Sequence, residues 1–370
     1  MSYLDIALKI IKKLNNNNFE AYIVGGYVRD YLLNNNPNDI DITTSALPSD
    51  IQKLFDKVIP TGIDFEGVTV VLDCYTFELT TFRKDLDYYD HRHPNVAYAS
   101  SLEEDLARRD FTINAMCLDY NLNVIDLYNG KKDLNDKIIR TVGNPIKRFD
   151  EDALRMLRAF YFASKLNFDI DPDTLNGIEK NAKYIESVSG ERIYNELSKL
   201  INSAYQMKGL KYLANSKLIK YLPSLEKGTC KIVNKNIDVN LNEFYAINFY
   251  LSGYSNRYKL SNALAKSIKT IINYVDKVLD NYDIFVLDVE TLKSINKVKL
   301  ILDKDYQESL IDKKNNLVIS NIKELDINAK DIISIGYEGK DIKDKLEYAL
   351  RLVLDKKCEN KKDKIIAKIK

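Results

Sequence analysis

Two short groups of residues near the start of the chain have the chemistry of a phosphate-handling site. Gly25 and Gly26 follow the apolar run 21–24, which has strand character, so the backbone can turn sharply there and approach a ligand closely. A helix is expected from about Tyr27. A triphosphate suits a helix N-terminus because the first N–H groups have no partner within the helix.

Asp39 and Asp41 form the second group. They are two residues apart on a predicted strand, so both side chains leave the same face, where two carboxylates repel each other unless cations lie between them. Mg²⁺ is the expected cation because hard oxygen ligands and substrate phosphates form its usual shell. Each group alone is more often a plain turn or a solvated strand end, but together in this order they predict nucleotidyl transfer.

Longer segments farther along the chain strengthen this interpretation. They are Glu78 to Arg83, Arg108 to Met116, Arg148 to Ala159, Ser189 to Leu197, Leu218 to Pro223 and Leu325 to Ile332. With the glycine turn and the aspartate pair, they resemble the nucleotidyltransferase superfamily that includes DNA polymerase β. The resemblance is greater to its class II branch of tRNA CCA-adding enzymes and bacterial poly(A) polymerases.

The resemblance implies an α+β nucleotidyltransferase head, polymerase β-like, followed by an elongated all-α neck, body and tail. We expect the head at residues 1–140, a neck with a base-recognition helix at 141–206, a body at 207–290 and a tRNA-binding tail at 291–370. Residues 1–150 hold 17 Lys and Arg against 23 Asp and Glu, whereas the remainder holds 38 against 31. A basic half suits a polyanionic partner, although solvated Lys-rich helices explain the excess equally well.

Hydrophobic periodicity gives a similar outline. We predict an opening helix at 2–14, strands at 22–24, 40–43, 68–75, 76–82 and 124–127, and helices near 27–33, 49–55 and 109–116. From Pro145 onward nearly every segment has a helical pattern.

The resemblance also implies roles for the carboxylates. Asp39 and Asp41 would hold two metal ions that activate an RNA 3′-hydroxyl and neutralise the leaving pyrophosphate. Glu78, on a neighbouring predicted strand, resembles the third carboxylate of the superfamily. The alternative for Glu78 is an ion pair with Arg83.

Nucleotide contacts implied by the resemblance fall on Gly25, Gly26, Arg29, Arg109 and Asp110. For Arg29 the alternative is a salt bridge to Asp30 or Asp41. For Asp110 the alternative is capping of an apolar helix expected at 111–118, which would leave Arg108 and Arg109 unexplained.

Asp152, Arg155 and Arg158 are spaced three apart, so one helical face would present an acceptor and two guanidinium groups. Cytosine and adenine both offer an amino donor beside a ring-nitrogen acceptor. An Asp acceptor next to an Arg donor can therefore pair with either base and reject guanine and uracil. Periodicity alone favours an ion pair between Asp152 and Arg155, and the resemblance favours base recognition.

The chain departs from the family pattern at a few positions. Tyr161 stands where an arginine is common, and a phenol can donate only one hydrogen bond. The loop Thr61 to Gly67 lacks a common histidine, and Ala329 stands where the family often has glycine.

Composition excludes several other classes. Scattered Cys74, Cys117, Cys230 and Cys358 indicate neither a zinc site nor a disulfide framework, and His91 and His93 are best explained as a solvated loop. No apolar run has membrane-spanning length, and the first residues lack the order of a signal peptide, so a cytoplasmic protein is expected.

CCA addition is the function that these features favour, with tRNA, CTP and ATP as partners, Mg²⁺ as cofactor, no membrane and the oligomeric state left open. An A-adding or CC-adding enzyme or a poly(A) polymerase is the alternative within the family. The intact segment Asp85 to Pro94 argues against a CC-only enzyme, and the 61–63 loop and the tail argue against a poly(A) polymerase. A noncatalytic RNA-binding protein and a small-molecule nucleotidyltransferase are alternatives of other classes.

Overall fold

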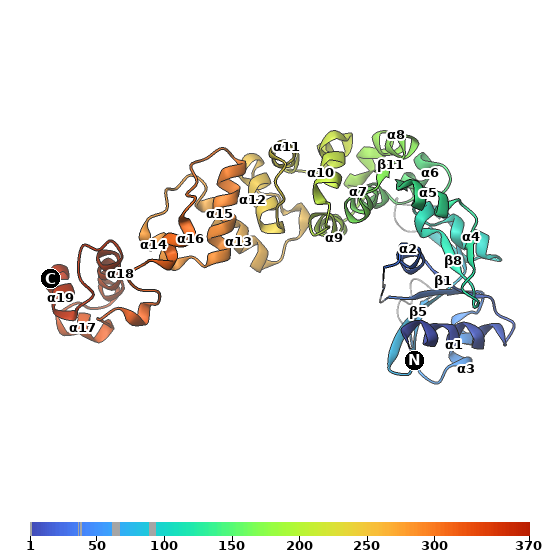
Figure 1. The fold of residues 1–370 in the computed structure, drawn as a ribbon, viewed down its shortest axis with the longest axis horizontal. Coiled ribbons are helices and arrows are strands. Elements are labelled where there is room, and N and C mark those ends of the chain that lie inside the picture. Colours follow the sequence, from blue (N-terminus) through green and yellow to red (C-terminus); the bar gives the residue numbers. More distant parts are fainter. Residues whose placement is uncertain (1, 36, 38, 61–66, 89–93) are drawn as a thin grey trace. The chain divides into compact units, whose positions relative to one another are not determined.

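The computed structural model describes residues 2–35, 37, 39–60, 67–88 and 94–370 (Figure 1). These residues divide into two compact units. The first comprises Met1–Pro223 with Arg257–Lys259, and the second Ser224–Asn256 with Leu260–Lys370. The four-part division into head, neck, body and tail remains a prediction. The predicted features at 61–66 and at His91 and His93 lie outside the described residues, as does part of the Asp85 to Pro94 segment.

A seven-stranded sheet forms the centre of the first part of unit 1. Its order is β3 (Val58–Pro60), β4 (Gly67–Leu72), β5 (Tyr75–Thr81), β2 (Asp41–Thr44), β1 (Ala21–Val24), β8 (Met116–Leu118) and β9 (Val124–Asp126). Only β2 and β5 pair in parallel; the other neighbours are antiparallel. The predicted strands at 22–24, 40–43, 76–82 and 124–127 are confirmed within one or two residues.

Three helices accompany the first strands, namely α1 (Tyr3–Asn15), α2 (Gly26–Leu32) and α3 (Pro48–Leu54), close to the predicted ranges. In α1 a capping box between Ser2 and Asp5 fixes the start. Apolar residues three and four apart, including Ile6, Ile10 and Leu14, form its buried face. The helix contacts β1 and β2 through that face.

The strand predicted at 68–75 is confirmed as β4, but it ends three residues early, because Asp73 and Cys74 both have positive φ and reverse the chain between β4 and β5. One prediction in the head is wrong. The helix expected at 109–116, with its apolar continuation to 118, is a 3₁₀ turn at Thr112–Asn114 followed by β8. A fully buried apolar run suits a helix or a strand, and β8 is a strand because β1 and β9 pair with it on both sides.

The remainder of unit 1 is mainly helical. It contains the hairpin β6 (Arg83–Tyr88) and β7 (Pro94–Tyr98), α4 (Leu102–Ala107), α5 (Gly130–Asp136), β10 (Ile138–Ile139), α6 (Pro145–Glu151), α7 (Leu154–Leu166), β11 (Asp169–Ile170), α8 (Pro172–Asn181), α9 (Gly190–Ile201) and α10 (Gln206–Asn215). Short 3₁₀ turns follow at Ala182–Ser187 and Lys217–Tyr221. Helix α7 packs against both α9 and α10.

Unit 2 is formed by helices, as the sequence predicts beyond Pro145. They are α11 (Glu226–Lys235), α12 (Leu241–Ser252), α13 (Asn262–Asn273), α14 (Asn281–Val286), α15 (Val289–Ile301), α16 (Leu310–Asn315), α17 (Ala329–Ser334), α18 (Lys340–Leu354) and α19 (Lys362–Ile369). An apolar cluster that includes Ile332, Val353 and Ile365 forms a core for its C-terminal helices. None of the helices formed by the described residues has both the length and the apolar composition needed to cross a bilayer.

Candidate active site

The glycine turn and the acidic pair lie together at one end of the central sheet. Val24, the last residue of β1, is paired with Asp41, the first residue of β2, and Gly25 follows directly. On its other side Asp41 is paired in register with Glu78 of β5. Asp39 is exposed two residues before Asp41. Asp41 and Glu78 are therefore neighbours on paired strands, and Asp39 lies just before them at this end of the sheet.

The electrostatics of Asp41 indicate an acidic group that lacks enough positive charge. Burial, followed by the charges of Asp39 and Glu78, raises the pKa of Asp41 to about 6, and the nearby Arg109 opposes this only partly. Among the described residues, Asp41 forms no ion pair with Lys or Arg, because Arg29 pairs with Asp30 and Arg109 pairs with Asp105. Hard carboxylate oxygens with uncompensated charge are the donor set that a divalent cation prefers. The residues present thus fit a metal ion, although no set of three or more described His, Cys, Asp or Glu side chains forms a ready-made cage.

Glycine is required at position 25 for two reasons. Its φ is +74°, in the left-handed region, and a Cβ there would lie 3.3 Å from Nη1 of Arg109 and 3.9 Å from Oδ2 of Asp41. Arg109 reaches this point because its Nη2 donates to Asp105 at 3.3 Å, while its buried Nε has no hydrogen-bond partner among the described residues. A guanidinium group with spare donors therefore faces the turn.

Asp105 explains why two adjacent arginines precede Asp110. This carboxylate is fully buried and accepts two hydrogen bonds from Arg108, at 3.1 and 2.7 Å, and one from Arg109. It also accepts from the hydroxyl of Thr43 on β2. Although burial acts to raise it, the pKa of Asp105 is lowered by the charges of Arg108 and Arg109. Sequence analysis missed Asp105, and α4, which carries it, was not predicted.

Arg29 is the member of the predicted nucleotide site that is most enclosed by protein. It is 3% exposed, it donates from Nε and Nη2 to Asp30 at 2.9 and 2.8 Å, and its Nη1 donates to Asn114 at 2.6 Å. Of the two salt bridges considered for it, the one to Asp30 is formed. Asn114 in turn donates to Asp110 at 3.1 Å. The glycine-bearing helix is thereby linked to the loop that follows Arg109.

Asp110 continues this network into α7. One oxygen accepts from the Phe111 N–H and from Asn114, and the other accepts from Nε of Arg158 at 2.8 Å. Burial acts to raise the pKa of Asp110, yet the charge of Arg158 and the hydrogen bonds lower it. The helix-capping alternative for Asp110 is wrong, since Phe111 occupies the cap position of a short 3₁₀ turn. Asp110 instead fixes the position of Arg158.

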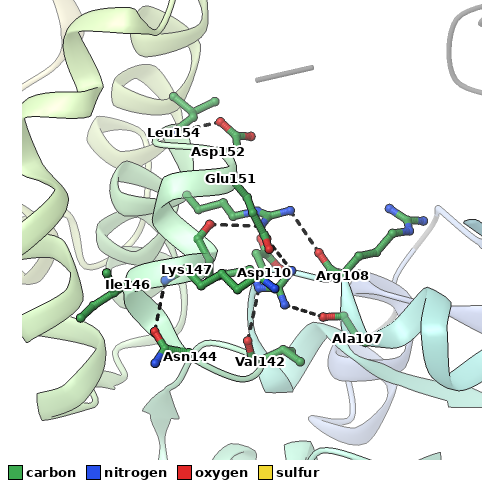
Figure 2. Close-up of polar contacts among 12 residues, drawn as sticks. Ala107, Arg108, Asp110, Val142, Asn144, Ile146, Lys147, Glu151, Asp152 and Leu154 are labelled. Carbon is green, nitrogen blue, oxygen red and sulfur yellow. Dashed lines mark hydrogen bonds and ion pairs between the residues drawn. The ribbon is translucent and has the colours of Figure 1, made fainter. Parts of the chain in front are cut away.

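The corner between α6 and α7 is built by two arginines around Glu151 (Figure 2). Oε2 of Glu151 accepts from Nη1 of Arg148 and from Nη1 of Arg155, both at 2.8 Å. Further acceptors for the two guanidinium groups are main-chain carbonyls: Val142 and Ala107 for Arg148, and Arg148 and Arg108 for Arg155. This corner is therefore fastened to the loop that carries Arg108 to Asp110.

The sequence predicted that Asp152 and Arg155 lie on one helical face, and this prediction is wrong. Helix α6 ends at Glu151 and α7 begins at Leu154, so Asp152 lies in the break, where one oxygen accepts from the Leu154 N–H. Among the ion pairs of the described residues, Arg155 binds Glu151 and not Asp152. Instead Asp152 accepts from Nη2 of Arg192 on α9 at 2.8 Å.

Helix α9 contributes a second residue that the sequence did not reveal. Glu196 is buried, binds Lys199 at 2.8 Å and lies 3.8 Å from Nη1 of Arg158, and its Oε2 has no partner among the described residues. Tyr161, at the position where an arginine was expected, is partly buried next to the ring of Phe162 and below Lys199. Arg192 and Glu196 fall in the Ser189 to Leu197 segment, so the resemblance located them without indicating a role.

Comparison with known proteins agrees with this geometry. Residues 21–140 match the poly A polymerase head domain, 167–228 match a family described as the probable RNA- and SrmB-binding site of polymerase A, and 254–369 match tRNA nucleotidyltransferase domain 2. The CCA-adding enzyme of Staphylococcus epidermidis is 34% identical over 97% of this chain and 96% of its own length.

Solved structures show the same arrangement. The crystal structure of the Bacillus stearothermophilus CCA-adding enzyme in complex with CTP matches with a TM-score of 0.83 and 33% identity, covering 100% of this chain and 97% of that one. The Thermotoga maritima CCA-adding enzyme complexed with tRNA has a TM-score of 0.71 at 22% identity, covering 98% and 94%, and at that identity it supports the fold alone. The predicted fold, a mixed α/β head followed by helices, is confirmed.

Proposed function

The chain belongs to the CCA-adding enzyme family of tRNA nucleotidyltransferases, and we propose that its chemistry takes place at the edge of the sheet that carries Gly25, Asp39 and Asp41. The reaction adds C, C and A in turn to the 3′ end of tRNA from CTP and ATP, without a nucleic-acid template. Because its substrates are tRNA, CTP and ATP, we propose that the enzyme acts in the cytoplasm. The single observation that carries the site assignment is the pairing of Asp41 with both Val24 and Glu78.

Members of the nucleotidyltransferase family generally use divalent metals, and Mg²⁺ is the ion that we propose here. Asp39 and Asp41 would hold it, with Glu78 beside them as the third carboxylate. A bound divalent ion would lower the pKa of the attacking 3′-hydroxyl and neutralise charge on the leaving pyrophosphate. The raised pKa of Asp41 supports this assignment because a neighbouring positive charge would relieve the repulsion among the three carboxylates.

We assign the triphosphate to Gly25, Gly26 and Arg109. The backbone at Gly25 has no side chain to block a phosphate, and Arg109 directs a guanidinium group to that point. Arg29, which is buried and bound to Asp30 and Asn114, supports Asp110 from behind. The direct nucleotide contact that the resemblance implied for Arg29 stays a prediction beside this support role.

Base recognition is assigned to Asp152, Arg155 and Arg158. Their partners Arg192, Glu151 and Asp110 come from three different elements and hold each side chain in one orientation. Orientation matters because a hydrogen-bonding site rejects the wrong base only when its own donors and acceptors are fixed. The base of an incoming nucleotide would form hydrogen bonds with Asp152 and Arg155, either in addition to these contacts or in exchange for them. The two side chains would then act in place of a template strand.

Stepwise nucleotide addition tests the proposed function. Purified protein is incubated with tRNA ending at the discriminator base, at C or at CC, each nucleotide is supplied separately, and products are resolved to single-nucleotide length. Two additions from CTP followed by one from ATP are expected. Addition of A alone, of C alone or of an indefinite tail would select an A-adding enzyme, a CC-adding enzyme or a poly(A) polymerase instead. An Asp41→Ala preparation purified in parallel reveals contaminating activity.

A further inference from the structure

The end of α12 leaves a tyrosine on the surface of unit 2. Gly253 follows the helix with a φ of +84°, which glycine adopts without strain, and its N–H donates to the carbonyl oxygen of Phe249 at 2.9 Å. Tyr254 comes next and is 59% exposed. Its ring meets that of Phe249 in an edge arrangement, with centroids 5.0 Å apart and an interplanar angle of 65°. Phe249 therefore supports the ring of Tyr254 and leaves most of it uncovered.

Tyr254 lines an apolar pocket together with α13, the helix that packs against α12 (Figure 1). The volume of the pocket is about 530 Å³, within the range of about 300–1,000 Å³ that is usual for small-molecule sites. Its other lining residues lie on one side of α13 and are Ala265, Lys266, Ile268, Lys269 and Ile272. Lysine stems contribute methylene groups to such a wall. The pocket thus offers an aromatic ring and aliphatic carbon to its occupant.

The two lysines of this pocket carry charges that no acidic side chain balances. Among the described residues neither Lys266 nor Lys269 forms an ion pair, whereas Lys304 of the same unit binds Asp276 at 2.6 Å. The surrounding sequence is basic as well, because residues 244–275 include four Lys and Arg and no Asp or Glu. An apolar pocket is therefore combined with uncompensated positive charge.

That combination favours RNA over an apolar protein segment as the occupant. A protein segment that buries only apolar side chains gains nothing from two unpaired lysines. A nucleotide uses both features, because its base stacks on an aromatic ring whatever the sequence and its phosphates attract lysine. Proteins that bind folded RNA commonly take up unstacked bases in this way.

We propose that this pocket binds a base of the substrate tRNA, which stacks on Tyr254 while neighbouring phosphates contact Lys266 and Lys269. The inference rests on the proposed function, because it takes tRNA as the substrate. The pocket belongs to unit 2, and the carboxylates assigned to catalysis belong to unit 1. The pocket therefore contributes affinity for tRNA and takes no part in the chemical step. Sequence analysis expected tRNA contacts in the tail at 291–370, and α13 adds a contact site before it.

The first test compares Tyr254→Ala, Tyr254→Phe and Tyr205→Ala. Tyr254→Ala removes the stacking ring, Tyr254→Phe keeps it, and Tyr205→Ala removes a ring of unit 1 that is 50% exposed. Filter binding measures the affinity for tRNA that ends at the discriminator base. Single-turnover assays measure C addition at saturating tRNA. Far-UV circular dichroism at the assay temperature verifies that the variants are folded.

Tyr254→Ala should weaken tRNA binding about 5- to 100-fold, the effect of one lost base–aromatic stack. Its rate of C addition at saturating tRNA should equal that of the wild type. Tyr254→Phe and Tyr205→Ala should each change the affinity by less than about 2-fold, because the first retains the stacking ring and the second lies outside the pocket.

The second test separates the phosphate contacts from stacking by their salt dependence. The double variant Lys266→Ala and Lys269→Ala should lower the slope of log affinity against log salt concentration by about 1–2, because two phosphate contacts are lost. Tyr254→Ala should leave the slope unchanged, since stacking releases no counterions. The double variant Lys53→Ala and Lys57→Ala removes the same charge from exposed positions in the head and should also keep the slope.

Unchanged tRNA affinity in Tyr254→Ala, or an equal loss in Tyr205→Ala, overturns the RNA contact. Sedimentation velocity tests the other occupant: a wild-type dimer that Tyr254→Ala converts to a monomer, with tRNA affinity unchanged, assigns the pocket to a second copy of the chain and also overturns the proposal. If the wild type binds tRNA and adds nucleotides while Tyr254→Ala binds equally well, only the pocket is refuted. If the wild type itself does neither, the proposed function fails.

Discussion

The acidic edge of the sheet, with Asp39, Asp41 and Glu78, and the arginine-rich corner near α7, which here includes Asp110 and Arg158, shift the pKa values of their carboxylates in opposite directions. At the edge, the pKa of Asp41 is raised to about 6 by burial and by its acidic neighbours. At the corner, Arg158 and hydrogen bonds lower the pKa of Asp110 even though it is buried. Both regions belong to unit 1 and are connected through Arg29 and Asn114.

The difference separates two uses of charge. A site that must attract a cation is improved by acidic groups without enough counter-charge, whereas a site that must present donors and acceptors in one orientation needs every group paired. The first arrangement costs stability in the absence of the ligand. The second contributes stability and makes the geometry rigid. Changes in the two regions should therefore affect activity and stability differently.

The largest effect is expected at the acidic edge. Asp39→Ala and Asp41→Ala should each lower the rate of C addition by about 1,000-fold or more, because the transition-state charge is no longer neutralised. Single-turnover assays measure the rate, and filter binding should show nearly unchanged tRNA affinity. Asp56→Ala, which removes an exposed aspartate of the same head, is the matched control. Persistent turnover in either active-site variant would refute the metal role.

At the corner, Asp110→Asn should mainly affect stability. The amide cannot accept from both Arg158 and Asn114 as the carboxylate does, which leaves the Arg158 charge without its main partner. We expect a loss of about 2–4 kcal/mol in the free energy of unfolding, measured by urea denaturation. Asp136→Asn, which breaks an exposed ion pair with Lys132, should change it by less than about 1 kcal/mol. Equal losses would remove the contrast between the regions.

Arg155→Ala should relax base choice. Discrimination of CTP and ATP against UTP and GTP should fall by about 10- to 100-fold, because one of the fixed donors is lost. Competition assays with pairs of nucleotides give the ratio, and tRNA affinity serves as an internal reference. Lys147→Ala, at an exposed position on α6, should leave the ratio unchanged. Unaltered selectivity in Arg155→Ala would contradict recognition of the base by this corner.

The smallest effect is a pH dependence caused by Asp41. A carboxyl whose pKa is higher in the folded state binds its proton more readily there, so its contribution to the free energy of unfolding falls as pH rises from about 4 to about 6. In metal-free buffer, Asp41→Asn should gain about 1–3 kcal/mol relative to the wild type at pH 7 and much less at pH 4. Mn²⁺ should reduce that gain at pH 7. A gain that is independent of pH would show that the negative charge of Asp41 does not lower the stability of the folded state.

The sequence predicted the parts of the fold that depend on local pattern. Short runs with strand character located β1, β2 and β5, although β2 begins at Asp41, so that Asp39 lies two residues before the strand and not on it. The apolar run at 111–118 was assigned wrongly, because only its neighbours β1 and β9 determine that it pairs as a strand. No proline or glycine marks the break at Asp152, so its helix end was invisible to pattern analysis.

Contacts between residues far apart in the chain could not be predicted from the sequence either. Arg192 is 40 residues from Asp152, and Asn114 is 85 residues from Arg29. Nothing in the spacing of these residues indicates that they meet. The resemblance supplied the candidate site residues, and the structure supplied the contacts that orient them.

The contacts that hold the α6–α7 corner determine which substitutions it tolerates during evolution. Four of the acceptors used by Arg148 and Arg155 are main-chain carbonyls, those of Ala107, Arg108, Val142 and Arg148. A main-chain carbonyl persists whichever side chain the codon specifies. A substitution at position 107 or 142 would therefore keep these two acceptors, as long as a residue at the buried position 142 still packs, whereas replacement of Arg148, Arg155 or Glu151 removes the side chains that form the contacts.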